Sequence, residues 1–201
     1  DVQRLRAASS AVITGIETVL ADDPALNVRA AELSLDQEEI ARNEIALSRQ
    51  PLRIILDSGL RTPADARILS FPGEVKVFTL AQPYSAENPA PNVEDLRVQS
   101  SGERVNLHSV LESLASDFGC TEVLVEAGAT LSTAFIEAGL VDELIVYIAP
   151  KLLGSDARAL LNIAGIQSMS DTLNFEIADL RQFEHDIRVV LKPVRSQSIE
   201  N

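Results

Sequence analysis

The sequence predicts an α/β fold, a mostly parallel sheet with helices on both faces that ends in an antiparallel hairpin. Short apolar runs such as residues 52–56 end in turns, which is typical of strands buried on both faces. Residues 121–148 alternate strand, helix and strand, the pattern of parallel strands joined by a right-handed crossover. Residues 172–180 and 187–192 alternate polar and apolar side chains around a turn, as hairpins do. A chain of 201 residues with 46% hydrophobic content predicts one domain, residues 1–201.

The first elements follow from short local patterns. Residues 1–8 match the end of a helix, and the apolar run 11–14 before a glycine predicts a buried strand. A short helix over 16–21 is expected to end at Asp22-Asp23-Pro24, because proline disfavours helical geometry in the residue before it. Residues 30–50 are polar and helix-prone. They predict a surface excursion, to which no chemistry is assigned.

The remaining elements alternate in type. Strands are predicted over 52–56 and 75–80, then a proline-containing loop over 84–92 and a short strand at 96–99. A helix over 105–118 is indicated by apolar residues at helical spacing. Strand 121–125, helix 130–138 and strand 143–148 complete the crossover unit before the terminal hairpin.

Composition excludes several classes of protein. A net charge of −13 argues against nucleic-acid binding, which needs clustered Lys and Arg. The apolar runs are too short for a membrane span, which needs roughly 18 residues. The one cysteine, Cys120, leaves no internal disulfide or cysteine-based metal cluster and is expected to be a small buried residue. With two histidines, no metal site is predicted. We expect a reducing, cytoplasmic setting.

A strand-to-helix corner carries the sharpest local signal. Strand 123–125 runs into Glu126, and Gly128 precedes a helix that contains Thr130 and Ser132. Backbone N–H groups at such a helix start suit a phosphate, although packing alone also explains a glycine at this place. Glu126 fits either a proton donor or acceptor facing a substrate, or a cap of the next helix.

Two further turns contain candidate binding groups. Asp22 and Asp23 before proline are explained by turn chemistry, since neither a histidine nor a third acid accompanies them. Arg6 and Arg29 are the nearest basic residues, and a forked guanidinium suits a sugar phosphate as well as a solvated surface. In the third turn, Ser58 and Arg61 match either contacts to an adenosine ribose or its 2′-phosphate, or a plain turn. Lys151 reads mainly as exposed.

Three long segments, Arg4–Arg29, Pro51–Pro63 and Val123–Ala157, together resemble the reductase domain of the bacterial bifunctional riboflavin biosynthesis protein. The strings Thr-Val-Leu-Ala-Asp-Asp-Pro and Glu-Ala-Gly-Ala-Thr-Leu, in this order and separation, carry the resemblance. It runs from Asp1 to about Leu191, with weak similarity over 30–50 and 72–106. The resemblance implies a dihydrofolate-reductase-like fold and transfer of hydride from NADPH to 5-amino-6-(5-phosphoribosylamino)uracil. It also implies a homodimer.

The resemblance assigns site residues motif by motif. Cofactor contacts are implied for Thr18, Asp22, Ser58, Gly128, Ala129, Thr130, Leu131, Ser132, Thr133 and Ala134. Substrate contacts are implied for Arg6, Leu26, Arg29 and Glu126, with the arginines toward the sugar phosphate and Glu126 toward the pyrimidine. Glu126 is the candidate catalytic residue, and no proton donor is assigned. Catalysis in this fold is mainly the juxtaposition of nicotinamide and acceptor carbon.

Two departures from the family pattern define the alternatives. The family's reductase domain opens with a strand and a Ser/Trp-containing loop, and a zinc-dependent deaminase domain accompanies it. This chain starts after that strand, so we expect the first strand and the deaminase domain upstream in the parent protein. A reductase of the same fold that acts on another pterin or pyrimidine is one alternative. An inactive dimerising fragment is the other.

Overall fold

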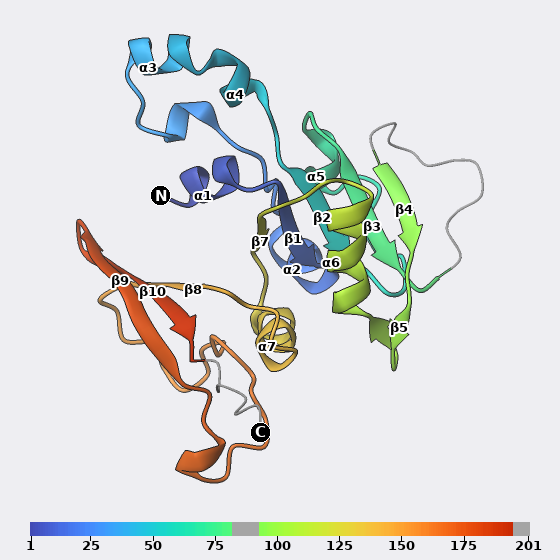
Figure 1. The fold of residues 1–201 in the computed structure, drawn as a ribbon, viewed down its shortest axis with the longest axis vertical. Coiled ribbons are helices and arrows are strands. Elements are labelled where there is room, and N and C mark those ends of the chain that lie inside the picture. The colour runs from blue at the N-terminus through green and yellow to red at the C-terminus, as the bar shows by residue number, and fades with distance from the viewer. Residues whose placement is uncertain (82–92, 195–201) are drawn as a thin grey trace, which may run out of the picture. The chain divides into compact units, whose positions relative to one another are not determined.

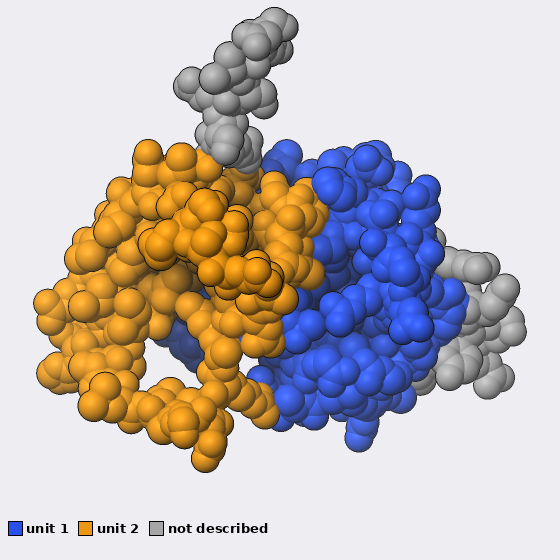
Figure 2. All heavy atoms as spheres, turned by 90° about the horizontal axis from the view of Figure 1, so that it is seen from below, with its two compact units in different colours: residues 1–131 blue, residues 132–201 orange. Residues whose placement is uncertain are grey.

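The computed structural model describes residues 1–81 and 93–194, which fall into two compact units (Figures 1 and 2). The first unit is Asp1–Leu131 and the second is Ser132–Asn201. The single-domain prediction therefore stays a prediction, and each unit is described by itself. The predicted loop at 84–92 lies outside the described residues.

The first unit is built around a five-stranded parallel sheet with the order β4-β3-β2-β1-β7. Its strands are β1 (Ala11–Gly15), β2 (Leu52–Leu56), β3 (Val75–Thr79), β4 (Val93–Arg97) and β7 (Val123–Val125). Its helices are α1 (Val2–Ala8), α2 (Ile16–Asp22), α3 (Gln37–Arg42), α4 (Glu44–Ser48), α5 (Arg67–Ser70) and α6 (Leu107–Ser116). A short 3₁₀ turn, η1, covers Ala30–Glu32, and β5 (Ser100–Ser101) pairs with β6 (Arg104–Val105). Because all five strands run parallel, their carboxyl ends share one edge.

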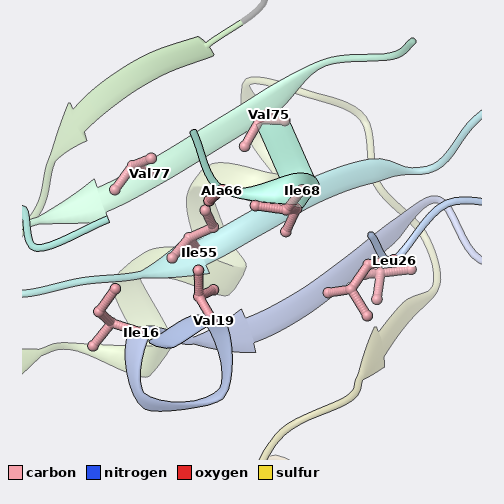
Figure 3. Close-up of a cluster of buried hydrophobic side chains, with 9 residues drawn as sticks. Ile16, Val19, Leu26, Ile55, Ala66, Ile68, Val75 and Val77 are labelled. Atoms are coloured by element: carbon pink, nitrogen blue, oxygen red, sulfur yellow. The ribbon is translucent and has the colours of Figure 1, made fainter. Parts of the chain in front are cut away.

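Helices cover both faces of this sheet, as predicted. On one face, α2 and α5 supply Ile16, Val19 and Ile68 to a core that also contains Ile55 and Val77 (Figure 3). The strand residues in between, among them Ile54 and Phe78, point to the opposite face and are fully buried. There the Lys76 ammonium lies 5.2 Å from the ring of Phe118, just after α6. The near-continuous burial of β1, β2 and β3 is what a doubly covered parallel sheet requires.

The second unit contains an antiparallel sheet with the order β8-β10-β9. The strands are β8 (Leu144–Ile148), β9 (Phe175–Phe183) and β10 (Asp186–Pro193), and a 3₁₀ turn, η2, covers Met169–Asp171. Helix α7 (Ala129–Glu137) begins in the first unit and ends in the second. The predicted terminal hairpin is confirmed, with Asp186 paired to Phe183 around the turn.

Several predicted details are corrected. The strand at 143–148 was expected to lie parallel in the sheet of the preceding strand, but β8 pairs antiparallel with β10, since the alternation of elements does not choose a strand's neighbour. The short strand at 96–99 begins earlier, as β4. The helix at 105–118 starts at Leu107 because Val105 belongs to β6. Cys120 is half-buried rather than buried, and burial raises the pKa of its thiol.

Candidate active site

The turns after β1 and β7 meet at the carboxyl edge of the parallel sheet. The backbone N–H of Gly128 donates a hydrogen bond to Thr18 Oγ1 at 3.2 Å, although the two residues are 110 positions apart. The two strands are hydrogen-bonded neighbours, so their carboxyl ends must emerge side by side. Helix α7 begins directly after Gly128, and its first-turn N–H groups lack partners inside the helix. Hydroxyl and amide donors thus gather where open α/β sheets bind ligands.

The turn after β2 is held by a buried carboxylate. Asp57 is fully buried, and its Oδ2 accepts hydrogen bonds from the backbone N–H of Thr62 at 2.7 Å and from the Thr62 hydroxyl at 2.8 Å. Leu60 packs against the core and adopts a left-handed backbone with φ of 51°. Such a conformation is costly for a leucine and persists only when its surroundings enforce it. The Ser58 carbonyl accepts from the backbone N–H of Leu80 at 3.3 Å.

An ion pair joins this turn to the start of α2. The Arg61 Nη2 donates to Glu17 Oε1 at 2.6 Å, and both side chains are more than half exposed, at 52% and 76%. The hydrogen bond that Arg61 donates to the Glu17 carboxylate raises the pKa of the Arg61 guanidinium. Since Glu17 directly precedes Thr18, the turns after β2, β1 and β7 form a continuous row along the edge.

Beside this row, Arg6 and Glu126 form a bidentate pair. Arg6 Nε donates to Glu126 Oε1 at 2.6 Å and Arg6 Nη2 donates to Glu126 Oε2 at 2.7 Å. The side chains are only 13% and 24% exposed, and Arg6 Nη1 donates to the Asn27 carbonyl at 3.2 Å. Both oxygens of Glu126 therefore accept hydrogen bonds, which suits an acceptor that orients a substrate's N–H groups better than a proton donor.

The other two predicted substrate residues differ in accessibility. Leu26 is 3% exposed and belongs to the hydrophobic core, so only its backbone, with φ of 50°, is available to a ligand. Arg29 is anchored by its backbone N–H, which donates to Gln3 Oε1 at 2.9 Å, one helical turn from Arg6. Its side chain is 55% exposed, and its guanidinium pairs with Glu32 at 3.0 Å. Arg29 is thus more accessible to a phosphate than Arg6.

The remaining predicted cofactor positions lie at two places. Asp22 is exposed at the last residue of α2. Ala129, Thr130 and Leu131 form the first turn of α7, whereas Ser132, Thr133 and Ala134 follow in the second unit. There the Thr133 side chain is buried, and its Oγ1 accepts from the backbone N–H of Asn162 at 2.8 Å. That hydroxyl holds the second unit's own backbone in place.

Sequence reasoning missed the contributions of Asp57 and Glu17. Asp57 was seen only as part of a turn, although a carboxylate directly after a buried strand and before a Ser-Gly pair is a recognisable loop-fixing signal. Glu17 had no signal of its own. Its meeting with Arg61 depends on the pairing of β1 with β2, which lie 37 or more residues apart in the sequence.

Elsewhere the described residues offer little competing chemistry. A cavity of about 400 Å³ lies at the opposite edge of the sheet, lined by residues that precede strands, such as Ser10, Gly73 and Glu74. Across residues 1–81 and 93–194, no group of three His, Cys, Asp or Glu side chains is arranged to hold a metal ion. Within the same ranges, no helix is long and apolar enough to span a bilayer.

Comparison with known proteins places the chain in one family. The family model described as RibD C-terminal domain matches residues 1–189. The riboflavin biosynthesis protein RibD of Escherichia coli is 43% identical over 187 residues, which cover 93% of this chain and 50% of that protein. A Buchnera aphidicola protein named 5-amino-6-(5-phosphoribosylamino)uracil reductase is 33% identical, with 96% of this chain and 91% of that protein covered.

A solved structure agrees with these relatives. Acinetobacter baumannii RibD superposes with a TM-score of 0.81 at 43% identity, covering 96% of this chain and 49% of that one. The chain therefore spans about half the length of several curated relatives that it matches. The predicted fold class, a mostly parallel sheet with a C-terminal antiparallel hairpin, is confirmed by the topology and by this likeness.

Proposed function

Because the chain belongs to the RibD C-terminal domain family, we propose that it reduces 5-amino-6-(5-phosphoribosylamino)uracil with NADPH in riboflavin biosynthesis. The observation that supports this most directly is the row of turns at the carboxyl edge of the sheet. Thr18 and Gly128 touch there, and the Arg6–Glu126 pair lies beside them. We further propose a zinc-dependent deaminase domain as its partner in the parent protein, and a cytoplasmic location.

The residues present fit a nicotinamide dinucleotide. The Thr18 hydroxyl, the N–H groups at the start of α7 and Ser58 are the kinds of donors that hold phosphates and ribose. When bound, the cofactor supplies hydride from nicotinamide C4 to C1′ of the opened ribose. The chain's own task is to hold the two carbons in reach and to exclude water.

Substrate binding is assigned to the neighbouring polar groups. Glu126, fixed by Arg6, accepts hydrogen bonds from the pyrimidine N–H groups and so orients the ring. Arg29, exposed and flanked by Glu32, exchanges that partner for the substrate's phosphate. Leu26 contributes backbone rather than side chain.

The test is a pair of kinetic measurements on the full-length protein. Glu126→Gln keeps the size but removes the charge and one acceptor, and should lower kcat/KM about 10- to 100-fold, as loss of a charge-assisted hydrogen bond does, with NADPH affinity nearly unchanged. Glu38→Gln, on the exposed surface of α3, is the control. Unchanged turnover in Glu126→Gln would remove this residue from the site.

Arg29→Ala separates the phosphate from the ring. It should raise KM for the phosphorylated substrate by roughly 10-fold and leave a dephosphorylated substrate unaffected. Equal effects on both substrates would contradict the phosphate assignment. If the natural protein reduced another pyrimidine or a pterin more efficiently, the pathway assignment would fall while the fold and cofactor site stood.

We also propose that the protein forms a homodimer through the second unit. Apolar side chains stand exposed on its long hairpin, with Ile177 at 66% and Leu180 at 59%. Large exposed apolar side chains on one hairpin support an interface there, because extended apolar surface is typical of interaction sites. Sedimentation of the full-length protein tests this, and a monomer at micromolar concentration would contradict it.

A further inference from the structure

We propose that Arg61 binds the adenosine 2′-phosphate of the cofactor and that Glu17 competes for it, so that this ion pair sets the preference for NADPH over NADH. The inference rests on the proposed function and adds a specificity determinant to it. Neither residue belongs to the set that the family resemblance assigns.

The turns follow one another in a fixed order along the sheet edge. Strands β2, β1 and β7 are consecutive neighbours, so the Arg61 turn, Thr18 and Glu126 follow one another along the edge. The nicotinamide must face the substrate, which the Arg6–Glu126 pair marks at the β7 end. With the pyrophosphate at Thr18 and Gly128, the adenosine half of an extended dinucleotide points away from β7, toward Ser58 and Arg61.

The Arg61–Glu17 pair combines the two groups that distinguish NADPH from NADH. Dinucleotide sites distinguish their ligands at the adenosine ribose, where a carboxylate accepts from the free 2′-hydroxyl of NADH and an arginine binds the 2′-phosphate of NADPH. Here both groups are present and bonded to each other at 2.6 Å. Because the chain has a net charge of −13, its overall potential repels a phosphate, and a guanidinium at this place is needed to attract one. A 2′-phosphate offers Arg61 a stronger, bidentate partner than Glu17 does.

The Arg61 side chain is not needed to hold its own turn. The buried Asp57 carboxylate and the packing of Leu60 against the core hold the turn that carries Arg61. The backbone of this turn therefore does not depend on the Arg61 side chain. An exposed ion pair contributes little to stability. Arg53 shows the contrast: fully buried, it donates to the carbonyls of residues 68 and 71–73 and has a structural role.

The experiment is a titration of the full-length protein with NADPH and with NADH, which yields the ratio of the two dissociation constants. Arg61→Ala should weaken NADPH binding about 10-fold or more and leave NADH binding within about twofold, which lowers the selectivity ratio by the same factor. Glu17→Gln should tighten NADPH binding by a few-fold, because it removes both the competitor and a like charge. Arg42→Ala, an exposed arginine on α3, is the matched control and should change neither constant.

A second probe isolates the phosphate. Adenosine 2′,5′-bisphosphate should displace NADPH from the unmodified protein far better than 5′-AMP does, and Arg61→Ala should abolish this difference. Equal losses of NADPH and NADH in Arg61→Ala, or no loss of either, would overturn the inference while the cofactor assignment stood. The inference would also be overturned if the unmodified protein bound NADH more strongly than NADPH and Glu17→Gln reversed this preference. That result would mean that Glu17 binds the adenosine ribose of NADH. Absence of binding of both cofactors to the unmodified protein would refute the proposed function itself.

Discussion

The two units bury their apolar residues to very different extents. In the first, residues of β1, β2 and β3 such as Ile13, Ile54 and Val75 are completely inaccessible. In the second, large apolar residues on strands and loops are exposed to solvent, among them Leu152, Leu153 and Met169. Val190 is a buried residue of its sheet. Both units contain a β-sheet, so the type of secondary structure does not explain the difference in burial. A parallel sheet is covered by its own crossover helices, whereas the antiparallel sheet relies on whatever packs on it.

The contrast assigns different tasks to the units. The first carries the candidate cofactor row and the Arg6–Glu126 pair, on turns that a rigid, doubly covered sheet holds in place. Sites on rigid elements are positioned more accurately than sites on loose ones. The second unit presents apolar surface, which suits association.

The largest expected effect compares two apolar truncations. Phe78→Ala, in the inaccessible core of the first unit, should lower the free energy of unfolding by about 3–5 kcal/mol, because it removes buried area and leaves a cavity. Leu180→Ala, at a 59% exposed position of the second unit, should change it by less than about 0.5 kcal/mol in a monomer. Denaturant unfolding measures both.

Protein concentration sharpens this comparison. If two copies cover the second unit's sheet, Leu180→Ala should destabilise the protein in a concentration-dependent way, because association stabilises the folded state by mass action. A large effect that does not vary with concentration would show that the sheet is covered within one chain. If both substitutions changed the free energy of unfolding only slightly, the proposed difference between the two units would be wrong.

The next effect compares two aspartates that each hold a turn. Asp57 is fully buried and binds Thr62 through its backbone N–H and hydroxyl, whereas Asp171 is exposed and binds Ser168 in a capping box. Asp57→Ala should cost about 1–3 kcal/mol, since it leaves the two half-buried donors of Thr62 unpaired. Asp171→Ala should cost nearer to 1 kcal/mol, the usual value for an exposed cap.

Cofactor binding provides a second readout for this pair. Because Asp57 fixes the turn that carries Ser58 and Arg61, Asp57→Ala should also weaken binding of NADPH, whereas Asp171→Ala should not. Titration at a temperature where both variants remain folded separates binding from stability. An intact NADPH affinity in Asp57→Ala would show that the turn keeps its shape without the carboxylate.

The sequence predicted the first unit better than the second, for physical reasons. Buried strands are recognisable in the sequence as continuous apolar runs between turn residues. The run 52–56 is one of them, and it was predicted with the observed bounds of β2. Which strands pair with each other could not be predicted in the same way. Nothing local in 143–148 distinguishes a parallel neighbour from the antiparallel β10 that it finds. The ion pairs at the site were likewise hidden, because Arg6 and Glu126 are separated by 120 residues and meet only through the fold.

The smallest expected effect concerns acid stability of the second unit. Hydrogen bonds from Arg188 and, less strongly, Arg181 hold the pKa of Asp179 below its ordinary value. Arg188 is the cross-strand partner, because Asp179 lies on β9 and Arg188 on β10. A carboxyl whose pKa is lower in the folded than in the unfolded state stabilises the fold above its unfolded pKa, about 3.9. That contribution is lost as pH falls through the lower, folded value.

Asp179 should therefore link the β9–β10 hairpin to pH below about 4, while Asp117 serves as its counterpart in the first unit. The hydroxyl of Ser113 lowers the pKa of Asp117, but this contact is local to one helix end and should not affect the sheet. Carboxyl titration by NMR should place both midpoints below about 3.9. Asp179→Asn should make the second unit's unfolding less dependent on pH between about 2 and 4, whereas Asp117→Asn should not. Identical pH dependence in Asp179→Asn and the unmodified protein would show that the cross-strand pair contributes nothing to stability in acid.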